Sequence, residues 1–422
     1  MFMTNLKRTC MPDLSSDNCT VREPACWQHI GLLIAICLGL WAWTCGQWDL
    51  WGPDEARYVQ IAKELLPRHN WFLLTLHGQP YDEKPPLPFW MLAGMLKLNG
   101  GQVNNALVRL PSVFFASLSV VLSYVIGRKL WGARAGLLSA FVLLSSIQFL
   151  KDAPTTELNV IYTGWTVMSL AFWFLAPQTG KLSWLRTAGF WASMAGAFFT
   201  KGPLAIVVVF SALAGEAIVS RSLRPFSRVR PVAGLLFLSV LIGGWLLLQS
   251  QAVGSEFVAN QVKGQTLERF LSGKHEAPIW YYLYRLFTGV FVPWGVLLIL
   301  AIPRFKRLGR QLPPGMGAVL GWVLIPFLVL SLAHGKRQTY LLPLLPAMAL
   351  IVGWYLDRLQ IEGRAYPRLG NGLAMIFVAF GVLLICAAMA LGIAPSLLTK
   401  HGLMSSHFGL LILALLGSVV IG

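Results

Sequence analysis

Long apolar runs recur along almost the whole chain, and they constrain its fold more than any other feature. A helix of about 20 apolar residues is long enough to cross the hydrocarbon core of a bilayer. We predict about twelve such spans, over residues 29–45, 105–127, 133–150, 158–176, 184–200, 202–219, 231–250, 279–302, 315–333, 339–356, 371–393 and 408–422. Hydrophobic residues make up 56% of the chain and charged residues only 12%, which excludes an ordinary soluble domain. The sequence therefore predicts an all-α polytopic membrane protein.

Basic residues gather at alternate junctions between these runs and predict the side of the membrane that each junction faces. If the N-terminal tail is cytoplasmic, the inward junctions are 128–134, 181–186, 221–230, 304–310 and 358–368. They are rich in Arg and Lys and contain only Asp357, at an edge, and Glu362 as acids, which is the positive-inside pattern. Anchoring of this kind accounts for much of the net charge of +17, so no nucleic-acid partner is predicted.

The two ends of the chain complete the predicted layout. The first apolar run is long enough to remain as an anchor, so we expect no cleavable signal peptide. The last run stops at Gly422, and we expect that a C-terminal periplasmic domain is absent or truncated. The predicted parts are a cytoplasmic tail, 1–28, and a transmembrane domain, 29–422, with periplasmic loops at 46–104 and 251–278.

Most of the seventeen acidic residues fall on the segments predicted to face outward: Asp49, Asp54, Glu55, Glu64, Asp82, Glu83, Asp152, Glu157, Glu256, Glu268 and Glu276. Cations stand at the mouths of the spans on the same side. A charge inside the apolar slab costs about 2.5 kcal/mol or more, so such groups pair, face water or serve a function. Any single one is explained by snorkelling, but both signs on several outer segments indicate a functional site.

The first outer loop, residues 46–104, is the longest and is predicted to contain two short helices. Apolar residues recur at helical spacing at Tyr58, Ile61, Ala62, Leu65 and Leu66. Such a helix would start at Gly52-Pro53-Asp54, with Asp54 as its N-cap, and stop at Pro67. An amphipathic helix of this length is expected to lie in the membrane interface. The second helix is predicted over Leu87–Leu98. A helix cap is thus the plain structural alternative to any catalytic role of Asp54.

The residue types on the outer side suit a few kinds of ligand. Asp54, Glu83 and Glu157 suit an acceptor proton, a divalent cation or an amino group. Glu83 and His275 would bind a metal only if the fold brings them together, since a lone surface His is more often a simple hydrogen-bonding residue. The remaining candidates suit a phosphate held at the interface, and they are Lys84, Arg269, Lys336, Arg337 and the Tyr340 hydroxyl.

Several outer stretches, in the same order, resemble a known family. They are DEARY at 54–58, YDEKPPLPFW at 81–90, TTELN at 155–159, TKGP at 200–203, RFLSGKHEAPIWYYL at 269–283 and GKRQTYLLPLLPAMAL at 335–350. The chain resembles the bacterial lipid-linked-sugar transferases that include the 4-amino-4-deoxy-L-arabinose transferase of lipid A modification. It resembles the protein O-mannosyltransferases more distantly. The resemblance implies the GT-C membrane fold.

The resemblance also implies an activity and a partner. The donor would be a sugar on a polyprenyl phosphate, in particular undecaprenyl phosphate, in the bacterial inner membrane. The sugar would pass with inversion, on the periplasmic face, to lipid A, another envelope glycolipid or a protein. No organic cofactor is implied, and a divalent metal is left open.

The matching positions would take the family's roles. Asp54 would be catalytic, with Glu157 at the place of a second essential Asp. Lys84, Arg269 and Tyr340 would lie near the lipid phosphate, with Arg57 and Lys336 as helpers, and Glu83 and His275 would match a metal site. Two departures qualify this: Glu157 is one methylene longer than Asp, and Arg337-Gln338 replace an apolar residue and Pro.

Two other functions remain open at this point. A transporter or flippase of a lipid-linked sugar would need the same phosphate-binding cations. Such a protein is expected to place ionisable groups near the middle of the membrane, often within paired repeats, whereas here the centres of the spans are nearly free of charge. A membrane scaffold gives no reason for acids and bases to gather on one side.

Overall fold

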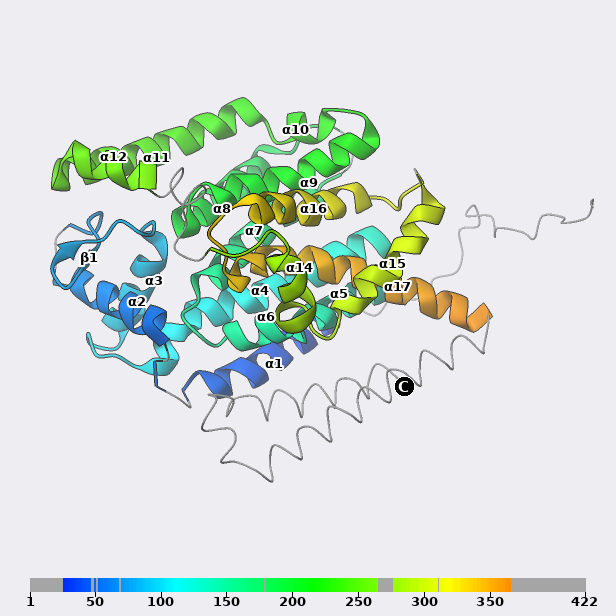
Figure 1. The fold of residues 1–422 in the computed structure, drawn as a ribbon, viewed down its shortest axis with the longest axis horizontal. Helices are drawn as coiled ribbons and strands as arrows, with labels where there is room; N and C mark the ends of the chain where they lie inside the picture. Colours follow the sequence, from blue (N-terminus) through cyan, green and yellow to red (C-terminus); the bar gives the residue numbers. More distant parts are fainter. Residues whose placement is uncertain are drawn as a thin grey trace, which may run out of the picture.

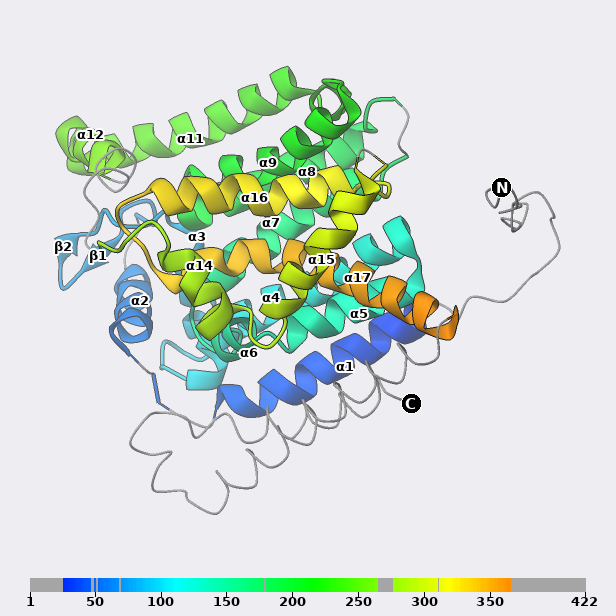
Figure 2. The ribbon, with the colours of Figure 1, turned by 45° about the vertical axis from the view of Figure 1, so that its right-hand side comes forward.

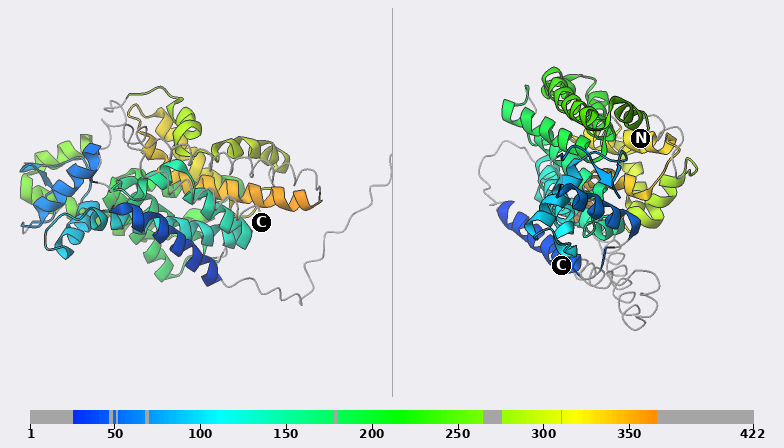
Figure 3. Two further views of the ribbon diagram at one scale, coloured as in Figure 1. Left: turned by 90° about the horizontal axis from the view of Figure 1, so that it is seen from below. Right: turned by 90° about the vertical axis from the view of Figure 1, so that its left-hand side faces the viewer.

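The computed structural model describes residues 26–46, 49–50, 52–67, 70–177, 180–264, 276–309 and 311–365. Helices form an elongated bundle, with α2, α3, the small hairpin and α12 at one end (Figures 1, 2 and 3). The elements are α1 (Cys26–Cys45), α2 (Gly52–Leu65), β1 (Thr75–Leu76), β2 (Gln79–Pro80), α3 (Leu87–Leu98), α4 (Asn105–Trp131), α5 (Ala133–Leu144), α6 (Ile147–Asp152), α7 (Leu158–Phe174), α8 (Trp184–Lys201), α9 (Leu204–Ser220), α10 (Arg224–Arg228), α11 (Pro231–Val253), α12 (Ser255–Lys263), α14 (Tyr281–Arg285), the π-helix η2 (Leu286–Val290), α15 (Gly295–Leu308), α16 (Met316–Leu332), the 3-10 helix η3 (Gln338–Leu344) and α17 (Leu345–Ala365).

Three helical segments in the described part of the chain are long and apolar enough to cross a membrane: Asn105–Trp131, Pro231–Val253 and Gln338–Ile361. A bent pair, Tyr281–Val290 with Gly295–Leu308, would make a fourth. Every apolar run predicted between residues 29 and 356 contains a helix, but several of these helices are shorter than a span. The predicted number of about twelve spans is therefore not confirmed, and runs 371–393 and 408–422 lie outside the described residues.

Two predicted spans are not single straight helices. Run 133–150 breaks after Leu144, where the hydroxyls of Ser145 and Ser146 donate hydrogen bonds to the carbonyls of Phe141 and Val142. Serine side chains in this position compete with the helix backbone. Run 279–302 bends by 119° between η2 and α15. Its break contains a proline, which has no N–H to continue a helix. The bend places α14 and its charged end at the surface of the bundle.

Helices α9 and α16 pack closely where glycines face each other, because small residues let the backbones of membrane helices approach. A Cβ atom added to Gly321 would lie 2.3 Å from the carbonyl oxygen of Ser211 and 2.6 Å from the Cα atom of Gly215. We expect Gly321→Ala to destabilise the protein by about 1–3 kcal/mol because the backbones must separate.

The matched control for this prediction is Gly243→Ala on α11, where an added Cβ meets no atom within 4 Å. Thermal unfolding of the detergent-purified protein should show a lower Tm for the Gly321 variant only. An equal loss in both variants would contradict the packing argument.

The loop predicted to be the first outer one folds into a small unit with its own core. The apolar stripe of α2, including Tyr58 and Ile61, is buried against Phe89 and Leu92 of α3. The rings of Tyr58 and Phe89 meet edge to face at 5.7 Å. Both helices were predicted, and the bounds of α3 coincide with the prediction. The stripe of α2 faces protein, however, so it does not supply the lipid contact expected of an interfacial helix.

Glu64 of α2 fastens the β1–β2 turn to this unit. Its carboxylate accepts hydrogen bonds from Thr75 Oγ1 (2.6 Å), Gln60 Nε2 (3.0 Å) and the backbone N–H groups of His77 (2.8 Å) and Gly78 (3.3 Å). Burial alone would raise the pKa of Glu64, but these hydrogen bonds outweigh it and lower the pKa to about 2.

This pKa predicts how the stability of the loop depends on pH. A carboxyl whose pKa is lower in the folded than in the unfolded protein stabilises above its unfolded pKa, here 4.5, and loses that effect as the pH falls toward 2. Glu64→Gln should therefore lower Tm at pH 7 and lower it less at pH 3. The same difference in Tm from the native chain at both pH values would refute this account.

Candidate active site

A polar pocket of about 460 Å³ is lined by residues of α2 and α14, together with residues from two other parts of the chain. Its lining comes from four separate parts of the chain: the first turn of α2, the N-cap of α7, α14, and residues 336–339, which lead into η3. The lining residues are Asp54, Glu157, Tyr281, Arg285, Lys336, Arg337, Gln338 and Thr339. Two carboxylates and three cations thus share one hollow, which suits a ligand that carries a negative charge and reacts at a neighbouring polar atom.

Asp54 stands in the first turn of α2, with each carboxylate oxygen next to a guanidinium group. Arg57, one turn along the helix, pairs with Oδ1, and Arg337 Nη1 lies 3.1 Å from Oδ2. Because α2 begins at Gly52, Asp54 lies inside the helix, and the predicted N-cap role is wrong.

Arg57 makes two further contacts besides its ion pair with Asp54. Its Nη1 lies 3.5 Å from Glu83 Oε2, and its guanidinium lies 5.5 Å from the ring of Tyr58. Burial alone would lower the pKa of Arg57, but the negative charge of Asp54 and Glu83, with the nearby tyrosines Tyr81 and Tyr58, raises it. Arg57 is therefore a fixed cation behind Asp54.

Glu157 is the N-cap of α7 and is held by a chain of polar contacts. Its Oε1 accepts hydrogen bonds from the backbone N–H of Asn159 (3.1 Å) and from the Asn159 side-chain amide. Lys201 Nζ donates to Asn159 Oδ1 and lies 4.1 Å from the centroid of the Tyr340 ring. This cation–π contact links Tyr340 to the carboxylate across three elements.

Asp152 lies in the protein interior close to this carboxylate. It is 6% exposed and accepts a hydrogen bond from the Gln148 side chain. Burial raises the pKa of Asp152, and the charge of Glu157 raises it further. Both effects disfavour the ionised form of Asp152 beside Glu157.

A buried ion pair fixes the two carboxylates relative to each other. Glu55, next to Asp54, accepts hydrogen bonds from Arg109 Nε (3.1 Å) and Nη2 (2.9 Å) and from the backbone N–H of Thr156 (2.8 Å), which precedes Glu157. Arg109 is 0% exposed and also donates to the carbonyl oxygens at the end of α1 and the start of the loop, those of Cys45 and Asp49. Helices α1, α2, α4 and α7 are tied together at this point.

The cationic side of the pocket is built from α14 and the segment before η3. Lys336 is 6% exposed, and its Nζ donates to the carbonyl oxygens of Ala277 (2.8 Å) and Ala333 (2.5 Å). A backbone bridge joins Glu276 to Gly335 beside it. Arg285 lies 5.5 Å and 5.8 Å from the ring centroids of two tyrosines, Tyr281 and Tyr284.

The structure brings some of the predicted site residues together and separates others. Asp54, Glu157 and Lys336 line the pocket, and Arg57 pairs with Asp54 behind the lining. Tyr340 follows the lining residue Thr339 and is linked to Glu157 through Lys201 and Asn159. Lys84 follows Glu83 in the loop before α3 and is not among the lining residues. Arg269 and His275 lie outside the described residues.

Of the two predicted metal ligands, only Glu83 lies within the described residues, so the pairing with His275 stays a prediction. Glu83 faces the guanidinium of Arg57, and a cationic neighbour opposes the binding of a second cation. No three His, Cys, Asp or Glu side chains among the described residues gather closely enough to hold an ion.

The prediction missed Arg285, Lys201 and Asn159 as site residues. Arg285 seemed to lie near the end of an apolar run, and the bend that turns α14 toward the pocket is not visible in hydropathy. Lys201 and Asn159 stand within the quoted TKGP and TTELN stretches, so the signal was present. Their contact with each other depends on the packing of α7 against α8.

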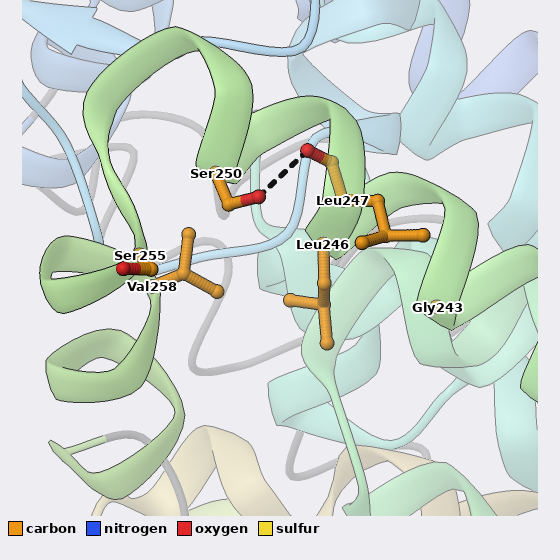
Figure 4. A pocket seen from close by; sticks show the side chains of 6 residues that line it. All are labelled: Gly243, Leu246, Leu247, Ser250, Ser255 and Val258. Carbon is orange, nitrogen blue, oxygen red and sulfur yellow. Dashed lines mark hydrogen bonds between the residues drawn. The ribbon is translucent and has the colours of Figure 1, made fainter.

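A second pocket, of about 350 Å³, lies between the end of α11 and the start of α12 (Figure 4). Its walls are mainly apolar and include Leu246, Leu247 and Val258, while Ser250 donates its hydroxyl back to a helix carbonyl. Helix α11 is exposed along much of its length, with Val232 at 82%. Such a surface is suited to lipid chains.

Comparisons with known proteins find relatives of the chain in sequence and in fold. The family model of dolichyl-phosphate-mannose-protein mannosyltransferases matches residues 83–246. The undecaprenyl phosphate-alpha-4-amino-4-deoxy-L-arabinose arabinosyl transferase of Edwardsiella ictaluri is 30% identical over 366 residues, which are 85% of this chain and 64% of that protein. The transferase of the same name from Erwinia tasmaniensis is 32% identical over 361 residues, covering 84% and 63%. The chain thus spans a little under two thirds of the length of these relatives.

Solved structures show the same fold. ArnT from Cupriavidus metallidurans bound to undecaprenyl phosphate is similar with a TM-score of 0.74 at 23% identity, over 94% of this chain and 77% of that one. The archaeal oligosaccharyltransferase AglB from Archaeoglobus fulgidus is similar with a TM-score of 0.57 at 14% identity, over 82% and 52%. The chain is therefore similar in sequence to these arabinosyl transferases over most of its own length, and it has the fold of the ArnT structure.

Proposed function

We propose that this chain is an integral-membrane glycosyltransferase that moves a sugar from a polyprenyl phosphate, such as undecaprenyl phosphate, to an envelope acceptor such as lipid A. The proposal rests on one observation above all. Two carboxylates, Asp54 and Glu157, line the same pocket as Arg285, Lys336 and Arg337. The names of the sequence relatives describe transfer of a sugar from this type of donor.

The chemistry of a phosphate-linked sugar matches what these residues can do. The bond between the anomeric carbon and the phosphate oxygen breaks, and the leaving phosphate takes the electron pair. Its growing negative charge is stabilised by Arg285, Lys336 and Arg337, with Lys84, Arg269 and Tyr340 as further candidates for phosphate contacts. The acceptor attacks from the opposite face, so the anomeric configuration inverts without a covalent enzyme intermediate.

The role of Asp54 depends on the acceptor. A hydroxyl acceptor loses a proton as it attacks, and Asp54 would take that proton as a general base. A phosphate acceptor is already ionised, and Asp54 would then orient the reactants. Glu157 is held by Asn159, which Lys201 contacts in turn. Its carboxylate would position the sugar or oppose a positive charge on the acceptor.

The proposed membrane setting is the bacterial inner membrane with the pocket facing the periplasm. It is supported by the basic junctions at the other end of the spans, such as 221–230 and 304–310. The polyprenyl chain would follow the apolar surface of α11 and α12. Helix α12 lies against the loop before α3, because Gln261 Nε2 donates to the carbonyl oxygen of Asp82 (3.2 Å).

A transfer assay with purified protein tests the proposal. The native chain in detergent is mixed with undecaprenyl phosphate that carries a labelled sugar and with an extract of envelope lipids and glycoproteins. We expect label to leave the polyprenyl phosphate and appear on an acceptor, identified by mass spectrometry. A flippase would leave the sugar–phosphate bond intact. If the donor stays intact with every acceptor fraction, the proposed transferase activity is wrong.

A further inference from the structure

Arg337 joins the two sides of the pocket across 283 residues of sequence. Its Nη1 lies 3.1 Å from Asp54 Oδ2, and the side chains of Arg337 and Asp54 are 44% and 33% exposed. Both residues line the pocket. The guanidinium therefore occupies the oxygen of Asp54 that is not already paired with Arg57.

The two arginines next to Asp54 are held very differently. Arg57 is the more buried of the two, sits on the same helix three residues away, and is also anchored by Glu83. Arg337 follows a backbone bridge in extended conformation, with φ −129° and ψ 141°, just before η3. Arg337 reaches Asp54 from a distant segment and is the more exposed arginine at 44%, whereas Arg57 is 26% exposed and pairs with Asp54 within one helix.

We propose that Arg337 is an exchangeable partner of Asp54, which moves to the phosphate of the carrier lipid when that phosphate binds and so releases one oxygen of Asp54 for the acceptor. The inference rests on the proposed function. In this arrangement Asp54 has that oxygen available to the acceptor only when a phosphate occupies the pocket.

The exchange is physically reasonable because the two partners of Arg337 differ in strength. A solvent-exposed ion pair with a carboxylate contributes little, since water competes with both ions. A phosphate offers several oxygens to the planar guanidinium and can accept two parallel N–H bonds. After transfer the carrier phosphate is a monoester with more charge than the donor, which strengthens its contact with Arg337 further.

Binding of undecaprenyl phosphate to the purified full chain tests the inference without any turnover. Titrations followed by intrinsic tryptophan fluorescence give Kd for the native chain, Asp54→Asn, Arg337→Gln and the double variant. Asp54→Asn removes the competitor for Arg337, so we expect tighter binding. That gain should be about fivefold larger in the native background than in the Arg337→Gln background, a coupling typical of residues in direct contact.

Arg337→Gln alone should bind about tenfold more weakly, and Arg337→Lys should recover part of the loss because it keeps the charge but not the planar fork. The matched control is Arg224→Gln, an exposed arginine of α10 that should bind like the native chain. Thermal unfolding of each variant verifies folding.

Two results would overturn the exchange: an equal effect of Asp54→Asn in both backgrounds, or native affinity in Arg337→Gln. These results are distinct from failure of the proposed function. If the native chain binds no undecaprenyl phosphate and transfers no sugar, both proposals fall. Binding and transfer without coupling between Asp54 and Arg337 would remove only this inference.

Discussion

Asp54→Asn is expected to lower sugar transfer by about 10²–10⁴-fold, the usual contribution of a positioned general base. Asn has the same shape, and the Asp54 side chain lies on the pocket wall at 33% exposure, so the fold should persist. The amide can neither accept the proton of an attacking hydroxyl nor oppose the charge of Arg57 and Arg337. The loss should therefore fall mainly on kcat, while the donor still binds.

The measurement is the initial rate of transfer at saturating donor, with Glu256→Gln as the control. Glu256 is an exposed acid of α12 that does not line the polar pocket. Its variant should keep native rates. Native kcat in Asp54→Asn would show that this carboxylate neither accepts a proton nor orients the reactants.

Glu55→Leu is expected to destabilise the protein by about 3–5 kcal/mol, the largest effect we predict for a residue that does not line the pocket. Arg109 would keep its charge at 0% exposure without a carboxylate, because a guanidinium does not lose its proton in proteins. The backbone N–H of Thr156 would lose its acceptor as well. Arg109→Met should cost less, since Glu55 keeps its hydrogen bond from the backbone N–H of Thr156.

The double variant, Glu55→Leu with Arg109→Met, should recover part of this loss. It leaves no unpaired charge, although the carbonyls of Cys45 and Asp49 lose their donor. Tm values of the three purified proteins provide the comparison. If the double variant is no more stable than Glu55→Leu, an unpaired buried charge is not the cause of the instability.

The helices were predictable where hydropathy and local sequence agree. The α3 helix has the predicted bounds because a proline-rich turn precedes it and Asn-Gly-Gly follows it. The break after α5 depends on two serine hydroxyls that bond to the backbone, and the bend before α15 depends on how the segment packs. Hydropathy averaged along the sequence reveals neither the break nor the bend.

The site was predictable as a set of charges, and much less so as a set of contacts. Asp54 and Glu157 stand at the mouths of spans on one side, and the structure places both in one pocket. The sequence could not assign Arg57 to Asp54 or Glu55 to Arg109, because each pairing depends on loop conformation. For the same reason Lys84, predicted beside the phosphate cations, lies outside the lining of the pocket.

A structure of the full chain with bound undecaprenyl phosphate would test the central claim most directly. The account predicts the phosphate within the 460 Å³ pocket, with Arg337 and Lys336 nitrogens about 2.7–2.9 Å from its oxygens and Asp54 facing the same space. A phosphate bound away from this pocket, with Asp54 and Arg337 still paired, would contradict it.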